Sequence, residues 1–323
     1  MRRLFILMII FVLFFALTNN VFGADPVTLR LSWAGSTTDI MYKAHELFAE
    51  LVDYRSKGNI KVELSTGLGA DVDLVEHVRT GVIDMTVCLK GEEYYPPLNL
   101  LLVPGIFKSP ESMYNILSGP IGQEFNKGFI DAAGIRILDW WWQGERHVTS
   151  NKKVGPIRTP QDLNKVKMRV PGIQPWLTCF KETGAGIVSL PFGEIYLALR
   201  QGVIDAQENP IPAIIAMKFY EVQDYLSLTS HIYSYQAVYM NEKKYQSLPP
   251  EYKEILERSV KDAGAWLVTK TKEIEREGLN FLREEGMEII EADKEAFRKV
   301  FKSAYKNISG AEEFSKRIEQ YEN

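Results

Sequence analysis

The sequence predicts an α/β fold, in which helices cover a mostly parallel sheet. From Val27 onward, short stretches with the alternation of a strand are followed by stretches with the apolar spacing of a helix, and parallel strands need such helical crossovers. A second observation is a helical pattern that begins at Pro249-Pro250 and continues to about Glu285. A helix of about 35 residues is roughly 50 Å long, which exceeds the width of a small domain, so we expect it to lie across two lobes.

The elements of the first half follow one another at short intervals. Three segments alternate as strands, namely 27–31, 60–64 and 82–89. Two segments have helical spacing, namely 42–54 and 71–79. After the long helix we expect a short strand over 287–290 and a closing helix from Lys294.

One short segment occurs twice. Residues 79–84 and 200–205 share Arg-x-Gly-Val-Ile-Asp, and in both copies a helix ends at the glycine and a strand begins at once. The repeat indicates either two lobes of similar architecture or the chance recurrence of a common turn. No low-complexity linker separates the halves, so we expect several crossings of one chain between the lobes.

The N-terminus has the pattern of a secretory signal peptide. Arg2 and Arg3 precede an apolar run over 4–17, which is followed by small residues up to Gly23. The run is shorter than the roughly 20 apolar residues that a membrane-spanning helix needs. We therefore predict a signal peptide over 1–23, cleaved near Gly23, and a periplasmic mature chain.

Composition narrows the class of partner. The chain has 323 residues and a formal net charge of −4, and its charged residues are interspersed, so neither nucleic acid nor anionic lipid is an expected partner. The two cysteines, Cys88 and Cys179, lie in an apolar run and in a predicted helix. We expect buried free thiols rather than a disulfide.

The first candidate site residue is Arg169. Residues 166–170 alternate as a strand, with Val166, Met168 and Val170 on one face and Arg169 on the other. The strand ends directly afterwards, and ligands in open α/β sheets bind at the carboxyl ends of strands.

The second candidate is Asn209. It precedes Pro210 and an apolar pattern over 211–217, which is typical of a helix start. A helix N-terminus offers free N–H groups and a positive dipole to an anion. By themselves these residues also fit an ordinary surface arginine and an ordinary helix cap.

Several motifs together resemble a known family. Residues 159–171 and 191–210, which end in Gln207-Glu208-Asn209-Pro210, are similar to the signature of the solute-binding proteins of tripartite ATP-independent periplasmic (TRAP) transporters. The resemblance extends over 56–58, 68–84, 219–222 and the long late helix. It therefore covers nearly the whole mature chain.

The resemblance implies a two-lobed, type II-like periplasmic binding protein with a ligand cleft between the lobes and a long helix spanning both. It implies a small organic acid whose carboxylate is held by Arg169 and contacted by Asn209. Arg146 matches a second arginine that contacts the carboxylate in some members, and Phe192 and Trp33 line the pocket. It further implies delivery to TRAP membrane permease subunits. We expect no cofactor and assign no metal-ligating residues, and whether a metal ion accompanies the ligand stays open. We place one lobe at 24–145 plus about 233–275, and the other at 146–232 plus about 276–323.

The chain departs from the sialic-acid-binding members of this family. After the third strand it has Leu89, Lys90 and Glu92 where those members have acids and an arginine, and Trp33 replaces a small polar residue. We therefore do not expect sialic acid as the ligand, and we keep Glu92 as a further candidate ligand-binding residue. A dicarboxylate, a 2-oxo acid, a sugar acid and an aromatic acid remain open.

Other functions are possible for such a fold. A binding protein for an ATP-driven importer or a membrane sensor would look similar, and the sequence signature favours the TRAP type. An enzyme is less expected, because the four histidines have no metal-ligand spacing and neither a nucleophile elbow nor a phosphate loop is present. We predict a protein that is not an enzyme.

Overall fold

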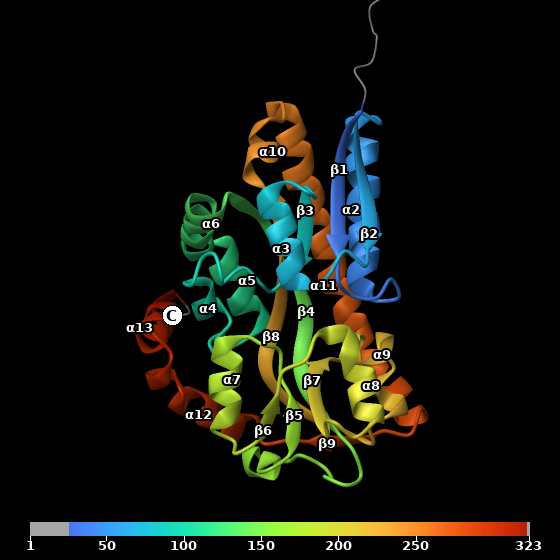
Figure 1. The fold of residues 1–323 in the computed structure, drawn as a ribbon, viewed down its shortest axis with the longest axis vertical. Coiled ribbons are helices and arrows are strands. Elements are labelled where there is room, and N and C mark those ends of the chain that lie inside the picture. Colours follow the sequence, from blue (N-terminus) through green and yellow to red (C-terminus); the bar gives the residue numbers. More distant parts are fainter. Residues whose placement is uncertain (1–25, 322–323) are drawn as a thin grey trace, which may run out of the picture.

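The computed structural model describes residues 26–321 (Figure 1). The predicted signal peptide and its cleavage site lie outside these residues. The described chain forms one nine-stranded sheet in the order β2-β1-β3-β8-β4-β7-β5-β6, with β9 paired to β8. The strands are β1 (Val27–Trp33), β2 (Ile60–Thr66), β3 (Met85–Cys88), β4 (Ile135–Ser150), β5 (Lys167–Arg169), β6 (Gly186–Val188), β7 (Ala206–Pro210), β8 (Tyr225–Asn241) and β9 (Glu288–Glu291).

Helices cover both faces of the sheet. The α-helices are α2 (Ile40–Ser56), α3 (Asp71–Thr80), α4 (Leu98–Leu101), α5 (Pro110–Ser118), α6 (Pro120–Ala133), α7 (Gln174–Lys181), α8 (Ile195–Arg200), α9 (Ile211–Ala216), α10 (Glu242–Gln246), α11 (Pro250–Glu284), α12 (Lys294–Ser303) and α13 (Ala311–Tyr321). Short 3₁₀ turns are η1 (Pro160–Leu163), η2 (Phe192–Glu194), η3 (Phe219–Glu221) and η4 (Tyr305–Asn307).

The long antiparallel pair of β4 and β8 joins two groups of strands (Figure 1). β1, β2 and β3 form parallel pairs and attach to one end of β8. β5, β6 and β7 attach to the opposite end of the pair through β4, while β9 runs parallel to the start of β8. The sheet is therefore mixed: parallel strands predominate on both flanks, and the centre is antiparallel because β4 and β8 carry the chain between the groups in opposite directions.

The long helix α11 has the predicted extent of 35 residues and packs against α2, β4 and α9. Two glycines permit this close packing. A Cβ on Gly264 would lie 2.9 Å from Cδ1 of Trp141, and a Cβ on Gly278 would lie 2.8 Å from Cγ2 of Ile211. Because Trp141 belongs to β4 and Ile211 begins α9, the helix is fixed against the central strand pair and against the helix that follows β7.

The repeated segment forms the same turn twice. Gly81 and Gly202 end their helices with φ of +79° and +69°, as the left-handed cap requires. The following isoleucines are buried, and the aspartates of both copies hydrogen-bond the backbone of a neighbouring strand through side chain and N–H. Both strands begin later than predicted, at Met85 and Ala206, because the Val-Ile-Asp residues complete the turn.

Cys88 and Cys179 are free and buried, as predicted. Burial raises the pKa of both thiols.

At the other end of the chain, α13 packs against α6 through the rings of Phe314 and Phe125, whose centroids are 5.7 Å apart. An ion pair between Arg317 and Glu124 joins the same two helices.

Candidate ligand-binding cleft

A cavity of about 560 Å³ lies where the two groups of strands meet. One wall is formed by the end of β1, the start of α3 and the segment after β3, and the other by the segments that follow β5 and β6. Five of the six predicted site residues line it, namely Trp33, Arg146, Arg169, Phe192 and Asn209. Residues predicted from distant parts of the sequence are thus brought to one place.

Arg169 is a buried cation without a carboxylate partner. Its side chain is at the end of β5, only 3% of the residue is exposed, and Nε and Nη2 donate to the carbonyl oxygen of Leu190 at 3.1 and 2.8 Å. Among residues 26–321, no carboxylate oxygen lies within 4.0 Å of its nitrogens. Burial lowers the pKa of Arg169 to about 10, so it remains charged at neutral pH. Glu208 and Asp71 partly oppose this fall in the pKa from a distance, but no carboxylate contacts the guanidinium, so the cavity presents a positive charge without a direct counter-ion.

Arg146 is buried too, but it is fully paired. Its Nε lies 2.5 Å from Oε2 of Glu208, and Nη2 donates to Oε1 of Glu208 and to Oδ1 of Asn209 at 2.9 Å each. Its guanidinium also lies 4.8 Å from the ring centre of Trp176. Burial alone would raise the pKa of Glu208, but Arg146 and His231 lower it below its ordinary value. The pair is therefore ionised, and its charges cancel.

Asn209 is not a helix cap, contrary to the prediction. It lies in β7 opposite His147 of β4, and Pro210, still extended with ψ of 154°, precedes α9. Pairing with β4 outweighs the local cap signal, because the strand needs an extended backbone at this point. The amide of Asn209 accepts from Arg146 and donates to Oε1 of Gln207 at 2.6 Å.

Glu92 is not among the residues that line the cavity. Its Oε1 accepts from Nζ of Lys90 at 2.7 Å, and its Oε2 accepts from the N–H of Gly91 at 3.0 Å. Lys90 lines the cavity instead. Glu92 therefore affects the cavity wall by holding the ammonium group of Lys90 in place.

The wall opposite Arg169 contains acids that the sequence did not reveal as site residues. Asp39 caps α2 by accepting from the N–H of Met41 at 2.8 Å, and Asp71 lies in the first turn of α3. Burial raises the pKa of each to about 6, with Lys90 and Arg169 opposing the shift at Asp71. Both residues carry ordinary helix-start signals, so nothing in the local sequence distinguished them from simple caps.

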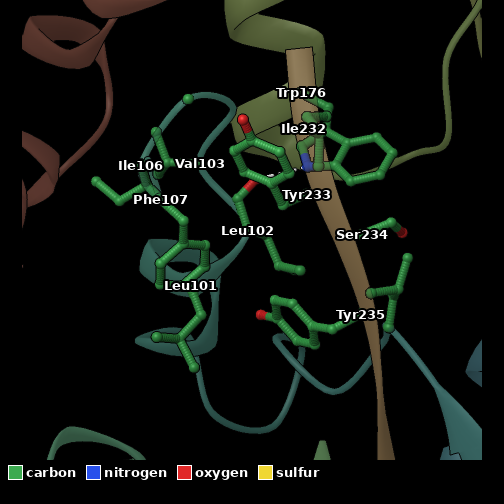
Figure 2. A pocket seen from close by; sticks show the side chains of 12 residues that line it. Leu101, Leu102, Val103, Ile106, Phe107, Trp176, Ile232, Tyr233, Ser234 and Tyr235 are labelled. Carbon is green, nitrogen blue, oxygen red and sulfur yellow. Dashed lines mark hydrogen bonds between the residues drawn. The ribbon is translucent and has the colours of Figure 1, made fainter. Parts of the chain in front are cut away.

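A second cavity is far smaller, at about 10 Å³, and holds no more than one water molecule (Figure 2). It lies between the segment after α4, Trp176 of α7 and the middle of β8. There Nε1 of Trp176 donates to the carbonyl oxygen of Leu102 at 2.5 Å. No organic acid fits this space, so the larger cavity is the candidate site.

Two kinds of feature are absent from residues 26–321. No group of three or more histidine, cysteine, aspartate or glutamate side chains is placed to hold a metal ion. Within the same range, none of the helices combines the length and the apolar character that crossing a membrane requires.

Comparison with known proteins identifies the family. Residues 31–312 match the model of the bacterial extracellular solute-binding proteins, family 7. The chain belongs to this family. It is 34% identical, over 84% of its length and 83% of the relative's, to the 2,3-diketo-L-gulonate-binding periplasmic protein YiaO of Escherichia coli. It is 31% identical to the sialic acid-binding periplasmic protein SiaP of Vibrio cholerae, with coverage of 87% and 88%.

Solved structures of TRAP periplasmic solute-binding proteins have the same fold. One from Roseobacter denitrificans with bound L-galactonate has a TM-score of 0.84 at 29% identity, covering 93% of this chain and 100% of that one. Another from Polaromonas, bound to D-erythronate, has a TM-score of 0.85 at 26% identity, with coverage of 90% and 98%. The predicted two-lobed α/β architecture and the TRAP solute-binding family are confirmed. The relatives are binding proteins, not enzymes.

Proposed function

We propose that this family 7 protein binds a hydroxylated organic acid, of the sugar-acid class, and delivers it to the permease subunits of a TRAP transporter. The observation that carries the proposal is the buried, unpaired guanidinium of Arg169 at the cavity. A buried cation is costly unless an anion compensates it. A ligand carboxylate supplies that charge and accepts the planar hydrogen bonds that a guanidinium donates.

The other predicted residues complete the carboxylate end of the site. Asn209 contacts the ligand while its amide oxygen is held by Arg146, and the neutral Arg146–Glu208 pair fixes the backbone on which Asn209 lies. Phe192 and Trp33 supply apolar walls. Glu92 acts through Lys90.

The opposite wall favours hydroxyl groups at the far end of the ligand. Ionised carboxylates only accept hydrogen bonds, so Asp39 and Asp71 suit donors such as hydroxyls. A second carboxylate on the ligand would face like charges there, which disfavours a dicarboxylate. The L-galactonate and D-erythronate in the related structures combine one carboxylate with several hydroxyls, which supports the same class.

Binding closes the two lobes around the ligand in this proposal. The lobes consist of 24–145 with about 233–275, and of 146–232 with about 276–323. The boundary in β4 follows a register shift between Trp142 and Gly144, where Gly144 has φ of +117°. A ligand that contacts both lobes stabilises the closed state, which the permease then recognises. The signal peptide directs the chain to the periplasm and is cleaved near Gly23.

The test is ligand binding by the mature chain from Ala24, measured by thermal melting and calorimetry. The panel contains aldonates, uronates, 2-oxo acids, dicarboxylates and aromatic acids, and each is also incubated with the protein to check that it is not converted. A ligand at about a hundred times its Kd adds about 2.7 kcal/mol to stability, which raises the melting temperature by several degrees.

Two variants assign the effect to the proposed residue. Arg169→Ala should weaken binding by roughly a hundredfold or more, because an unpaired ligand charge costs about 2–5 kcal/mol in a closed site. Lys167→Ala removes an exposed cation from the same strand and serves as the control. Unchanged affinity in Arg169→Ala, or shifts with dicarboxylates alone, would contradict the proposal.

A further inference from the structure

A hydrogen bond crosses the cleft at the cavity wall. Nζ of Lys90 donates to the carbonyl oxygen of Gly172 at 2.7 Å, and both residues line the large cavity. Lys90 follows β3, whereas Gly172 lies three residues after Arg169 at the end of β5. With the lobe boundaries proposed above, the donor and the acceptor belong to different lobes, so the bond exists only while the cleft is narrow.

The donor is held in place by its own lobe. Glu92 accepts from Nζ of Lys90 at 2.7 Å and from the N–H of Gly91 at 3.0 Å, which ties the ammonium group to the turn that carries it. The turn requires glycine at position 91, because its φ is +140° and a Cβ there would lie 2.8 Å from Cζ of Phe129. The side chain of Lys90 is only 18% exposed. Little rotamer freedom is therefore left to lose when the ammonium meets its acceptor.

The acceptor is equally well defined. It is a backbone oxygen, and the segment that carries it is hydrogen-bonded on both sides. The N–H of Val170 donates to the carbonyl oxygen of Val188 at 3.1 Å, and the N–H of Ile173 donates to the carbonyl oxygen of Pro171 at 2.7 Å. No ligand group is needed to complete this contact. The charge of Lys90 is balanced by Glu92, so it does not compete with Arg169 for the carboxylate.

We propose that Lys90 is a latch, a positioning residue that stabilises the closed cleft through Gly172 whichever acid the cleft contains. The proposal rests on the proposed function for its lobes and its ligand. One other bond between the lobes, from Trp176 to Leu102, lies beside the small second cavity (Figure 2). The Lys90 bond lies at the large cavity itself, where closing and opening change the distance between the walls.

A latch has a different signature from a ligand contact. The apparent Kd of a ligand equals its intrinsic Kd divided by the fraction of protein in the binding-competent state. Loss of Lys90 lowers that fraction, so every ligand should lose affinity by the same factor, about three- to tenfold. A direct contact would instead penalise some ligands and spare others.

The experiment compares Lys90→Met with the unmodified side chain by fluorescence energy transfer between the lobes. Dyes are attached at Val82→Cys and Val203→Cys, which occupy the exposed valines of the repeated turn, one in each lobe. The native Cys88 and Cys179 are buried and do not take label. The control is Lys43→Met, because Lys43 also lies 2.7 Å from a glutamate, Glu46, but contacts no second lobe.

In the ligand-free protein, Lys90→Met should reduce the closed fraction, and Lys43→Met should not. With two acids of different length, the Kd should rise by one common factor. Glu92→Gln should give a weaker form of the same effect in a protein with the same melting behaviour. If the distribution of energy-transfer efficiencies in the ligand-free protein is unchanged in Lys90→Met, the latch proposal is overturned. A loss of affinity confined to one acid overturns it as well. If no acid binds even the unmodified protein, the proposed function fails, while the ligand-free measurement still decides on the latch.

Discussion

Replacing Arg169 with methionine should have opposite effects on stability and on binding. Burial lowers the pKa of this guanidinium from 12.5 to about 10. One pKa unit corresponds to about 1.4 kcal/mol, so the folded, ligand-free protein disfavours the charged side chain by about 3 kcal/mol. Because the folded pKa is below the unfolded one, this cost applies in full at every pH below about 10 and disappears only as the pH rises towards 12.5.

The variant also loses two hydrogen bonds of the folded protein. The carbonyl oxygen of Leu190 no longer receives its two donors, and an unsatisfied buried acceptor costs about 1–3 kcal/mol. The two effects leave a net gain of between about 0 and 2 kcal/mol, which corresponds to a melting temperature up to several degrees higher in a chain of this size. We therefore expect ligand-free Arg169→Met to melt at the same or a higher temperature, while its Kd rises by at least about a hundredfold.

Differential scanning calorimetry without ligand and isothermal titration with the best acid of the panel measure the two quantities. Lys167→Met, at an exposed position of the same strand, should change neither. A fall of several degrees in the ligand-free melting temperature would show that Arg169 stabilises the fold, and the assignment of an uncompensated charge would then be wrong.

Three further predictions concern the rest of the site. Burial raises the pKa values of Asp39 and Asp71 to about 6, so both carboxylates become protonated as the pH drops from 7 to 5. Affinity for a hydroxylated acid should therefore fall over this range, and titration calorimetry at each pH would detect the loss. A flat profile would exclude them as acceptors. Glu208→Gln leaves Arg146 buried without its counter-ion, so it should lower the free energy of unfolding in urea by about 3–5 kcal/mol. A small change would mean that the ion pair is dispensable for the fold. Gly144 has a φ of +117°, and a Cβ there would lie 2.7 Å from Oε1 of Glu275. Gly144→Ala should therefore lower the free energy of unfolding by about 1–3 kcal/mol in the same assay. A neutral result would show that the segment relaxes easily.

Periodic patterns predicted the frame of the molecule well. The long helix and the repeated turn could be predicted because each depends on residues close in sequence. Pro249 and Pro250 stand at the start of the helix, and the glycines at 81 and 202 end the helices of the turn. Arg169 was found in the same way, since alternation placed it opposite Met168 at the end of a strand. Five of the six candidate residues line the cavity, although the resemblance to a family was needed to bring them together.

The remaining features depend on contacts between distant segments. Asn209 carries a helix-start signal, but pairing with β4 keeps it in a strand. The 2.5 Å contact of Glu208 with Arg146 joins residues 62 positions apart, and no local pattern indicates it. Asp39 and Asp71 resemble ordinary helix starts until the fold places both on one cavity wall. Sequence therefore predicted the elements, and tertiary contacts decided which charges are free.

The balance of these charges limits the ligand more strongly than the volume of the cavity does. Arg146 is neutralised by Glu208, and Lys90 by Glu92, so neither cation demands an anion. Arg169 is the buried cation at the cavity wall that is left without a carboxylate among the described residues. A single carboxylate on the ligand satisfies it. A second one would have to lie near Asp39 or Asp71, or displace Glu92 from Lys90, and each arrangement leaves a charge without compensation. The site is therefore built for a monoanion with neutral hydrogen-bond donors along the rest of its length.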